Sequence, residues 1–135
     1  MNTELLFLDT TFVQALLNRR DQYHTQAKGL LPRLRNAREV WVTEAVLVEI
    51  GNALSNLDRS VAVRFIAGCY KTANIHVVSV DTQLLKRALH LYQDRPDKGW
   101  GLTDCISFVV MKEHNLRTAL TADDHFRQAG FQILM

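Results

Sequence analysis

Four carboxylates occupy positions where the surrounding residues are typical of a hydrophobic core. Asp9 directly follows a short apolar run, and Asp123 follows a strand-like segment. Glu49 interrupts an apolar stretch, and Asp104 opens another. A charged side chain is costly to bury unless it is paired or binds a metal, and carboxylate oxygens suit Mg²⁺ and Mn²⁺. The pattern predicts a divalent-metal site, whose usual chemistry is attack of metal-activated water on a phosphodiester.

Glu49 is the acid that helix capping explains least well. Its helical neighbours at i−4, i−3 and i+4 are Ala45, Val46 and Ala53, and Asn52 is the remaining neighbour. Residues three and four apart share one face of a helix. We therefore expect Glu49 to face the protein rather than solvent, with Asn52 among the polar residues that support the site.

The other three acids each have a structural alternative. Asp9 is a possible helix cap, although the two threonines that follow it could cap that helix instead. Asp104 and Asp123 each stand at the start of an expected helix, where a cap or turn former is ordinary. Asp124 could exchange roles with Asp123. The metal hypothesis therefore requires that all four acids lie close together. The strands and helices that carry them must bring them to one place.

Hydrophobic periodicity predicts strands that alternate with helices along the whole chain. Strands are expected at residues 5–8, 40–42, 75–80, 117–121 and 131–134. Helices are expected at residues 12–19, 22–38, 44–55, 60–73, 82–93, 103–114 and 124–129, the second bent or broken by Gly29 and Pro32. This order predicts an α/β fold with a mostly parallel sheet of four or five strands flanked by helices. Ligands bind at the carboxyl ends of such strands, where the acids should meet.

Composition places the chain among ordinary globular proteins of one domain. It has 135 residues, 47% hydrophobic and 22% charged, with a formal net charge of +2. No apolar run is long enough to span a bilayer, and the amino terminus does not resemble a secretion signal. Cys69 and Cys105 lie in apolar helical patterns, so we expect buried thiols without a disulfide and a cytoplasmic location.

Four segments of the sequence together resemble the PIN-domain ribonucleases, including the toxins of bacterial toxin–antitoxin pairs. They are residues 6–11, 43–50, 100–108 and 120–126, and the resemblance covers the whole chain, residues 1–135, as one PIN-like domain. The resemblance implies that Asp9, Glu49, Asp104 and Asp123 form a catalytic, metal-binding quartet. It also implies that Thr11 and Thr121 orient the quartet.

The family also implies an activity and partners. These are a Mg²⁺- or Mn²⁺-dependent endoribonuclease, often a homodimer, which in toxin members is inhibited by a small antitoxin protein. The rival hypothesis is a catalytically silent PIN-like module that binds RNA or a partner protein.

Contacts to RNA are harder to assign because the net charge is small. Arg19 and Arg20 belong to a basic amino-terminal segment, and Arg95 and Lys98 lie in the long loop at residues 94–101. Arginine and lysine in such places are candidates for phosphate contacts. Trp100, in the same loop, could stack a base or anchor the loop by packing. His125 is the histidine nearest the predicted site, and we expect it to be a surface residue of the last short helix.

Overall fold

The computed structural model describes residues 2–135 and contains a five-stranded sheet in which every neighbouring pair of strands is parallel. The strand order is β3-β2-β1-β4-β5. The strands are β1 (Leu5–Leu8), β2 (Glu39–Thr43), β3 (Ile75–Val78), β4 (Thr118–Leu120) and β5 (Gln132–Leu134). The predicted fold class is confirmed. Because strands are added on one side of β1 and then on the other, β1 and β4 flank the point where the strand order reverses, where α/β sheets bind ligands.

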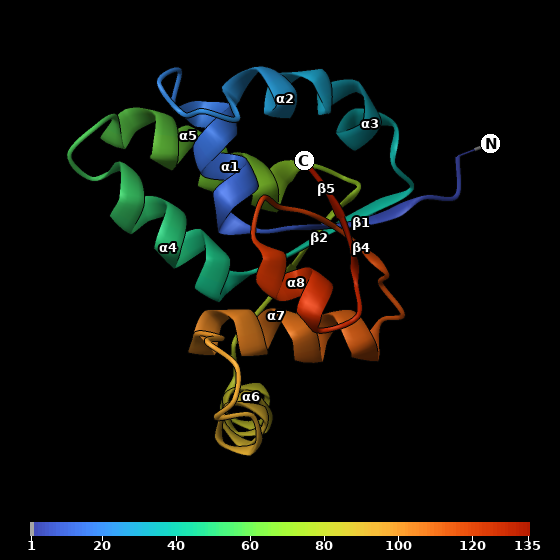
Figure 1. Ribbon diagram of the computed structural model, residues 1–135. Helices are drawn as coiled ribbons and strands as arrows, with labels where there is room; N and C mark the ends of the chain where they lie inside the picture. Colours follow the sequence, from blue (N-terminus) through green and yellow to red (C-terminus); the bar gives the residue numbers. More distant parts are fainter. Residues whose placement is uncertain (1) are drawn as a thin grey trace.

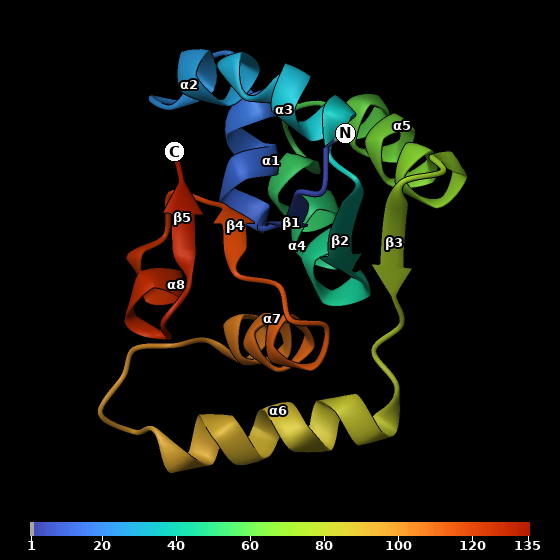
Figure 2. The same cartoon turned by 90° about the vertical axis from the view of Figure 1, so that its right-hand side faces the viewer.

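Eight helices connect and cover the strands of the described chain. They are α1 (Thr10–Leu17), α2 (His24–Gly29), α3 (Leu31–Asn36), α4 (Glu44–Leu54), α5 (Arg59–Lys71), α6 (Thr82–Asp94), α7 (Leu102–Glu113) and α8 (Asp124–Gln128). Helices α1, α2, α3 and α5 lie to one side of the sheet, whereas α7 lies on the other side with α6 outermost (Figure 1 and Figure 2). The expected helix over residues 22–38 is broken between α2 and α3, where Pro32 lies in the first turn of α3, as Gly29 and Pro32 predicted.

The helix that follows β1 corrects one expectation. Thr10 and Thr11 do not cap α1, because both lie inside the helix and Asp9 occupies the N-cap position without a side-chain cap hydrogen bond. By contrast, Thr43 caps α4, since its hydroxyl accepts a hydrogen bond from the Val46 amide at 3.2 Å. The carboxylate of Asp9 and the hydroxyls after it are therefore available for tertiary contacts.

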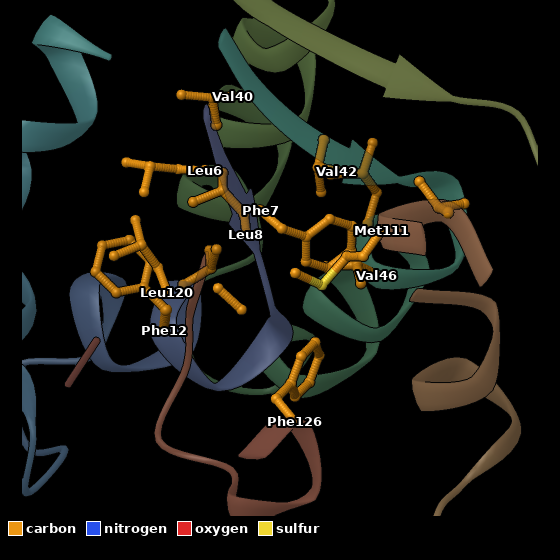
Figure 3. Packing of buried hydrophobic residues seen from close by; sticks show 14 of the residues in the cluster. Leu6, Phe7, Leu8, Phe12, Val40, Val42, Val46, Met111, Leu120 and Phe126 are labelled. Atoms are coloured by element: carbon orange, nitrogen blue, oxygen red, sulfur yellow. The ribbon is translucent and has the colours of Figure 1, made fainter. Parts of the chain in front are cut away.

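The core surrounds β1, which is buried on both faces. Leu6, Phe7 and Leu8 are fully buried, and Figure 3 shows Leu6 and Phe7 leaving the strand in opposite directions. The Phe126 ring of α8 lies 6.2 Å from that of Phe7 and 5.0 Å edge-on from that of Phe108 in α7. This aromatic cluster fixes α7 and α8 against the sheet, directly behind the residues that follow β1 and β4.

Two expectations about cellular setting can be compared with the structure. Cys69 and Cys105 are both free and buried, as predicted, and burial raises the pKa of each thiol to about 11. Within residues 2–135, every helix is too short or too polar to cross a membrane.

Candidate metal centre

The four predicted acids surround one cavity of about 410 Å³ at the carboxyl ends of β1 and β4. The residues that line it are Asp9, Thr10, Thr11, Gln14, Glu49, Asn52, Asp104, Asp123 and His125. Among these described residues the ionisable groups are four carboxylates and one histidine, without lysine or arginine. Such a donor set fits a hard divalent cation, because the ion would neutralise charge that the protein itself leaves uncompensated.

Asp9 is the most deeply placed acid, with only 3% of its surface exposed. Its Oδ2 atom accepts hydrogen bonds from the hydroxyls of Thr121 at 2.7 Å and Thr11 at 3.0 Å. Each hydroxyl is held in turn by a backbone amide, since Thr11 accepts from Ala122 and Thr121 accepts from Asp123. The two threonines thus fix one oxygen of Asp9, and the carboxylate orientation is set before any ligand arrives.

Burial, rather than a specific partner, dominates the electrostatics of the cavity. Desolvation raises the pKa of Asp9 to about 6, and the charge of Asp104 adds to the rise, whereas hydrogen bonds from Thr121, the Thr10 backbone and Thr11 oppose it. Desolvation also raises the pKa of Asp104, against hydrogen bonds from the Gly101 backbone and His125. Carboxylates held in this way ionise at a cost that a bound cation would offset.

Asp104 and Asp123 both serve their helices as well as the cavity. Asp104 Oδ2 accepts from the Gly101 amide at the start of α7 at 3.1 Å. Asp123 is the N-cap of α8, and its Oδ1 accepts from the His125 amide at 2.9 Å. The capping alternative is therefore real for both residues, yet capping leaves the second oxygen of each carboxylate for other contacts. Asp124 is exposed and pairs with Arg127 at 2.6 Å, so Asp123 and not Asp124 lines the cavity.

Glu49 does not face the protein as expected. It is exposed, as is Ala53 on the same side of α4, so only part of the predicted apolar stripe is buried. Its Oε1 accepts a hydrogen bond of 2.6 Å from the Thr10 hydroxyl. The side chain therefore lies at the rim of the cavity, held by the first residue of α1, and Asn52 lies near it on the lining.

His125 is the site residue that the sequence analysis misjudged. Its side chain is only 32% exposed, and Nδ1 lies 3.0 Å from Asp104 Oδ2 and 3.3 Å from Asp123 Oδ1. The expectation of a surface residue is wrong because α8 turns this side chain back toward α7. The signal in the sequence is its spacing, two residues after an N-cap aspartate, where a side chain lies beside the capping carboxylate.

The predicted RNA-contacting residues do not line the acidic cavity. Arg19 and Arg20 lie beyond the far end of α1, an eight-residue helix and so about 12 Å long. The Arg95 guanidinium is bonded to Asp97 by two hydrogen bonds of 3.0 Å and lies 5.3 Å from the Trp100 ring centre. Trp100 itself is 7% exposed, which makes it an anchor of the loop and not a stacking surface. Of the two predicted loop cations, Arg95 is paired with Asp97, whereas Lys98 has no ion pair among the described contacts.

Fold and cavity together define an α/β domain with an acidic site at the carboxyl edge of a parallel sheet. The family model of the PIN domain matches residues 6–132. The chain therefore belongs to the PIN-domain family, as its sequence indicated.

Solved structures with similar folds include toxins and their complexes. VapC20 of Mycobacterium tuberculosis, a sarcin-ricin loop cleaving toxin, is 26% identical over 93% of this chain and 95% of its own, with a TM-score of 0.83. FitAcB from Neisseria gonorrhoeae is 15% identical over 96% of each chain, with a TM-score of 0.64. VapBC2 from Rickettsia felis, bound to a DNA fragment from their promoter, is 16% identical over 96% of each chain, with a TM-score of 0.62. The comparison with curated proteins gave no match.

Proposed function

We propose that this protein is a divalent-metal-dependent endoribonuclease and the toxin of a toxin–antitoxin pair. One observation carries the proposal: all four acids that the sequence singled out line a single cavity in a PIN domain. The similarity to VapC20, a toxin that cleaves the sarcin-ricin loop, supports structured RNA as the substrate class. Free buried thiols support a reducing compartment such as the cytoplasm.

Asp9, Asp104 and Asp123 would hold the ion, with Glu49 completing the set from the rim of the cavity. A Mg²⁺ or Mn²⁺ ion held by these residues would supply an activated water and stabilise the charge that develops on the leaving oxygen. Thr11 and Thr121 both donate to Asp9 Oδ2, which would leave Oδ1 as the oxygen that binds the ion. Glu49 is exposed, and while Thr10 holds its Oε1, its other oxygen could orient the attacking water or receive its proton.

RNA backbone contacts must come from outside the cavity, because its lining holds no described lysine or arginine. We assign Lys98 to this role first, since it lies in the loop that leads into α7 and Asp104. Arg19 and Arg20 would reach only a more distant part of a bound RNA, and Arg95 is already engaged by Asp97. The family resemblance adds two partners to the proposal, a small antitoxin protein and a second copy of this chain.

The test is cleavage of end-labelled RNA hairpins, including one with the sarcin-ricin loop sequence, and of total bacterial RNA. Each is incubated with Mn²⁺, with Mg²⁺ or with a chelator. We expect discrete cleavage with metal and none with the chelator. Asp9→Asn should abolish cleavage, whereas Asp124→Asn, which changes a neighbouring acid outside the cavity, should leave it intact.

The silent-module hypothesis makes the opposite prediction in the same experiment. Wild-type protein would then shift the RNA in a gel without cutting it under any metal condition. A product pattern identical for wild type and Asp9→Asn would also exclude the acidic cavity as the source of activity, since it would indicate a contaminating nuclease.

A further inference from the structure

We infer that His125 is a nitrogen ligand of the ion held by Asp104 and Asp123, which makes this a mixed nitrogen–oxygen site that prefers Mn²⁺ to Mg²⁺. The inference deepens the proposed function and rests on it, because it assumes that an ion binds in the acidic cavity.

The positions of three side-chain atoms carry the inference. His125 Nδ1 lies 3.0 Å from Asp104 Oδ2 and 3.3 Å from Asp123 Oδ1. One ligand atom from each of these residues lies within 4.8 Å of the other two. Adjacent ligands of an octahedral ion with bonds of about 2.1 Å are about 3 Å apart. The imidazole nitrogen therefore already stands at the spacing of a neighbouring ligand.

A purely structural hydrogen bond explains this arrangement less well. A single Nδ1–H makes its best hydrogen bond to one of the two carboxylates that face it, here Asp104 Oδ2 at 3.0 Å, and accounts less well for Asp123 Oδ1 at 3.3 Å. Both oxygens also have backbone donors, from the Gly101 amide at 3.1 Å and the His125 amide at 2.9 Å. The imidazole is thus not needed to satisfy either oxygen, whereas an Nδ1 lone pair facing a shared cation uses both contacts.

The other ring nitrogen is placed to carry the proton that this role requires. A methyl group added to Gly99 would lie 3.8 Å from His125 Nε2, so Nε2 faces the Gly99 segment rather than the acids. The side chain as a whole is 32% exposed, so it is not sealed inside the core. In the metal-free chain, Nδ1 lies at hydrogen-bond distance from Asp104 Oδ2. When an ion binds, the neutral tautomer protonated at Nε2 would leave the Nδ1 lone pair for the ion, as a metal-binding histidine needs.

The surrounding fold holds the ring without further rearrangement. Phe126, the next residue, is fully buried in the aromatic cluster. The Trp100 indole N–H donates to Gln128 Oε1 at 3.1 Å, which ties the loop containing Gly99 to α8. A ligand side chain that is already held by packing and by outer hydrogen bonds loses little conformational entropy when an ion binds.

A nitrogen ligand has a consequence for metal choice that carboxylates alone do not have. Mg²⁺ prefers oxygen ligands and near-ideal octahedral geometry, whereas imidazole suits the transition metals better. We expect Mn²⁺ to bind more tightly than Mg²⁺ in the wild type. Replacing His125 by asparagine should lower Mn²⁺ affinity by at least about tenfold, since even outer-shell partners typically matter this much, and lower Mg²⁺ affinity less.

The experiment is pulsed electron paramagnetic resonance of the full chain loaded with Mn²⁺ alone, together with calorimetric titration of Mn²⁺ and Mg²⁺. The expected result is nitrogen modulation of the Mn²⁺ echo that disappears in His125→Asn. His90→Asn is the matched control, because this exposed histidine of α6 lies 3.5 Å from Asp94 and outside the cavity. Chemical denaturation without metal verifies that each variant folds.

Two results would overturn the inference, and they differ in what else they affect. Mn²⁺ binding without nitrogen modulation in the wild type would remove His125 from the ligand set and leave the proposed nuclease standing. Absence of both Mn²⁺ and Mg²⁺ binding would overturn the metal dependence in the proposed function, and the ligand assignment with it.

Discussion

Replacing Asp9 by asparagine should stabilise the metal-free protein while it abolishes cleavage. Asp9 is 3% exposed, and burial raises its pKa from 3.8 to about 6. A raised carboxyl pKa means that the folded state binds the proton more tightly than the unfolded state does. Asp9 therefore contributes stability that is fully present below pH 3.8 and is lost as the pH rises through about 6.

The shift sets the size of the effect. The rise in the pKa of Asp9 from 3.8 to about 6 corresponds to a cost of ionisation of about 3 kcal/mol at pH 7.5, at about 1.36 kcal/mol for each tenfold change in the acid constant. At pH 4.5 the same linkage leaves about 1 kcal/mol. Asparagine has nearly the same shape, does not ionise, and keeps an oxygen for the Thr121 hydroxyl. The variant should thus gain up to about 3 kcal/mol at neutral pH and about 1 kcal/mol in acid.

The assay is urea denaturation of both proteins with a chelator at pH 7.5 and pH 4.5. Asp124→Asn serves as the control, because this exposed residue should change the free energy of unfolding by about 0.5 kcal/mol or less at both pH values. Addition of Mn²⁺ should then stabilise the wild type more than Asp9→Asn. A variant that is less stable than wild type at pH 7.5, or a gain that does not shrink in acid, would refute the desolvation argument.

Three further substitutions test the parts around the site. Thr121→Val removes the 2.7 Å donor to Asp9 and should weaken metal binding by about 10–100-fold, measured by calorimetry, with a loss of about 1–3 kcal/mol in urea. Ser107→Ala should raise stability by about 1 kcal/mol without changing cleavage, because the Ser107 hydroxyl is buried without a described partner. Phe126→Ala should cost about 3–5 kcal/mol, seen as a lower denaturation midpoint, since its ring is fully buried between Phe7 and Phe108.

The sequence predicted the element order and sheet because those depend on local periodicity. The alternation of strands and helices, the break at Gly29 and Pro32, and the cap at Thr43 all express preferences of a few neighbouring residues. The convergence of Asp9 and Asp123 followed from the rule that strand ends of a parallel sheet meet at one edge. These features required no knowledge of how distant side chains pack.

The errors concern side chains whose surroundings come from distant segments. Thr10 was expected to cap its helix, but its hydroxyl meets Glu49, which is 39 positions away along the chain. The exposure of Glu49 depends on how α4 is rotated against α1, and a single helix pattern does not define that rotation. His125 meets Asp104, which is 21 positions away, only because Phe126 fixes α8 beside α7.

The burial of neighbouring carboxylates, which suits the cavity to a cation, also lowers the stability of the fold when no cation is bound. Carboxylates that are desolvated and close together would bind a cation strongly, because the hydrogen bonds they receive only partly offset the cost of ionisation, and that same cost destabilises the metal-free chain. The threonine hydroxyls lower this cost for Asp9 but do not remove it, since its pKa remains near 6. Selection for stability without metal would therefore replace Asp9 by a neutral residue. The presence of all four acids around one cavity is better explained by selection for ion binding than by selection for folding.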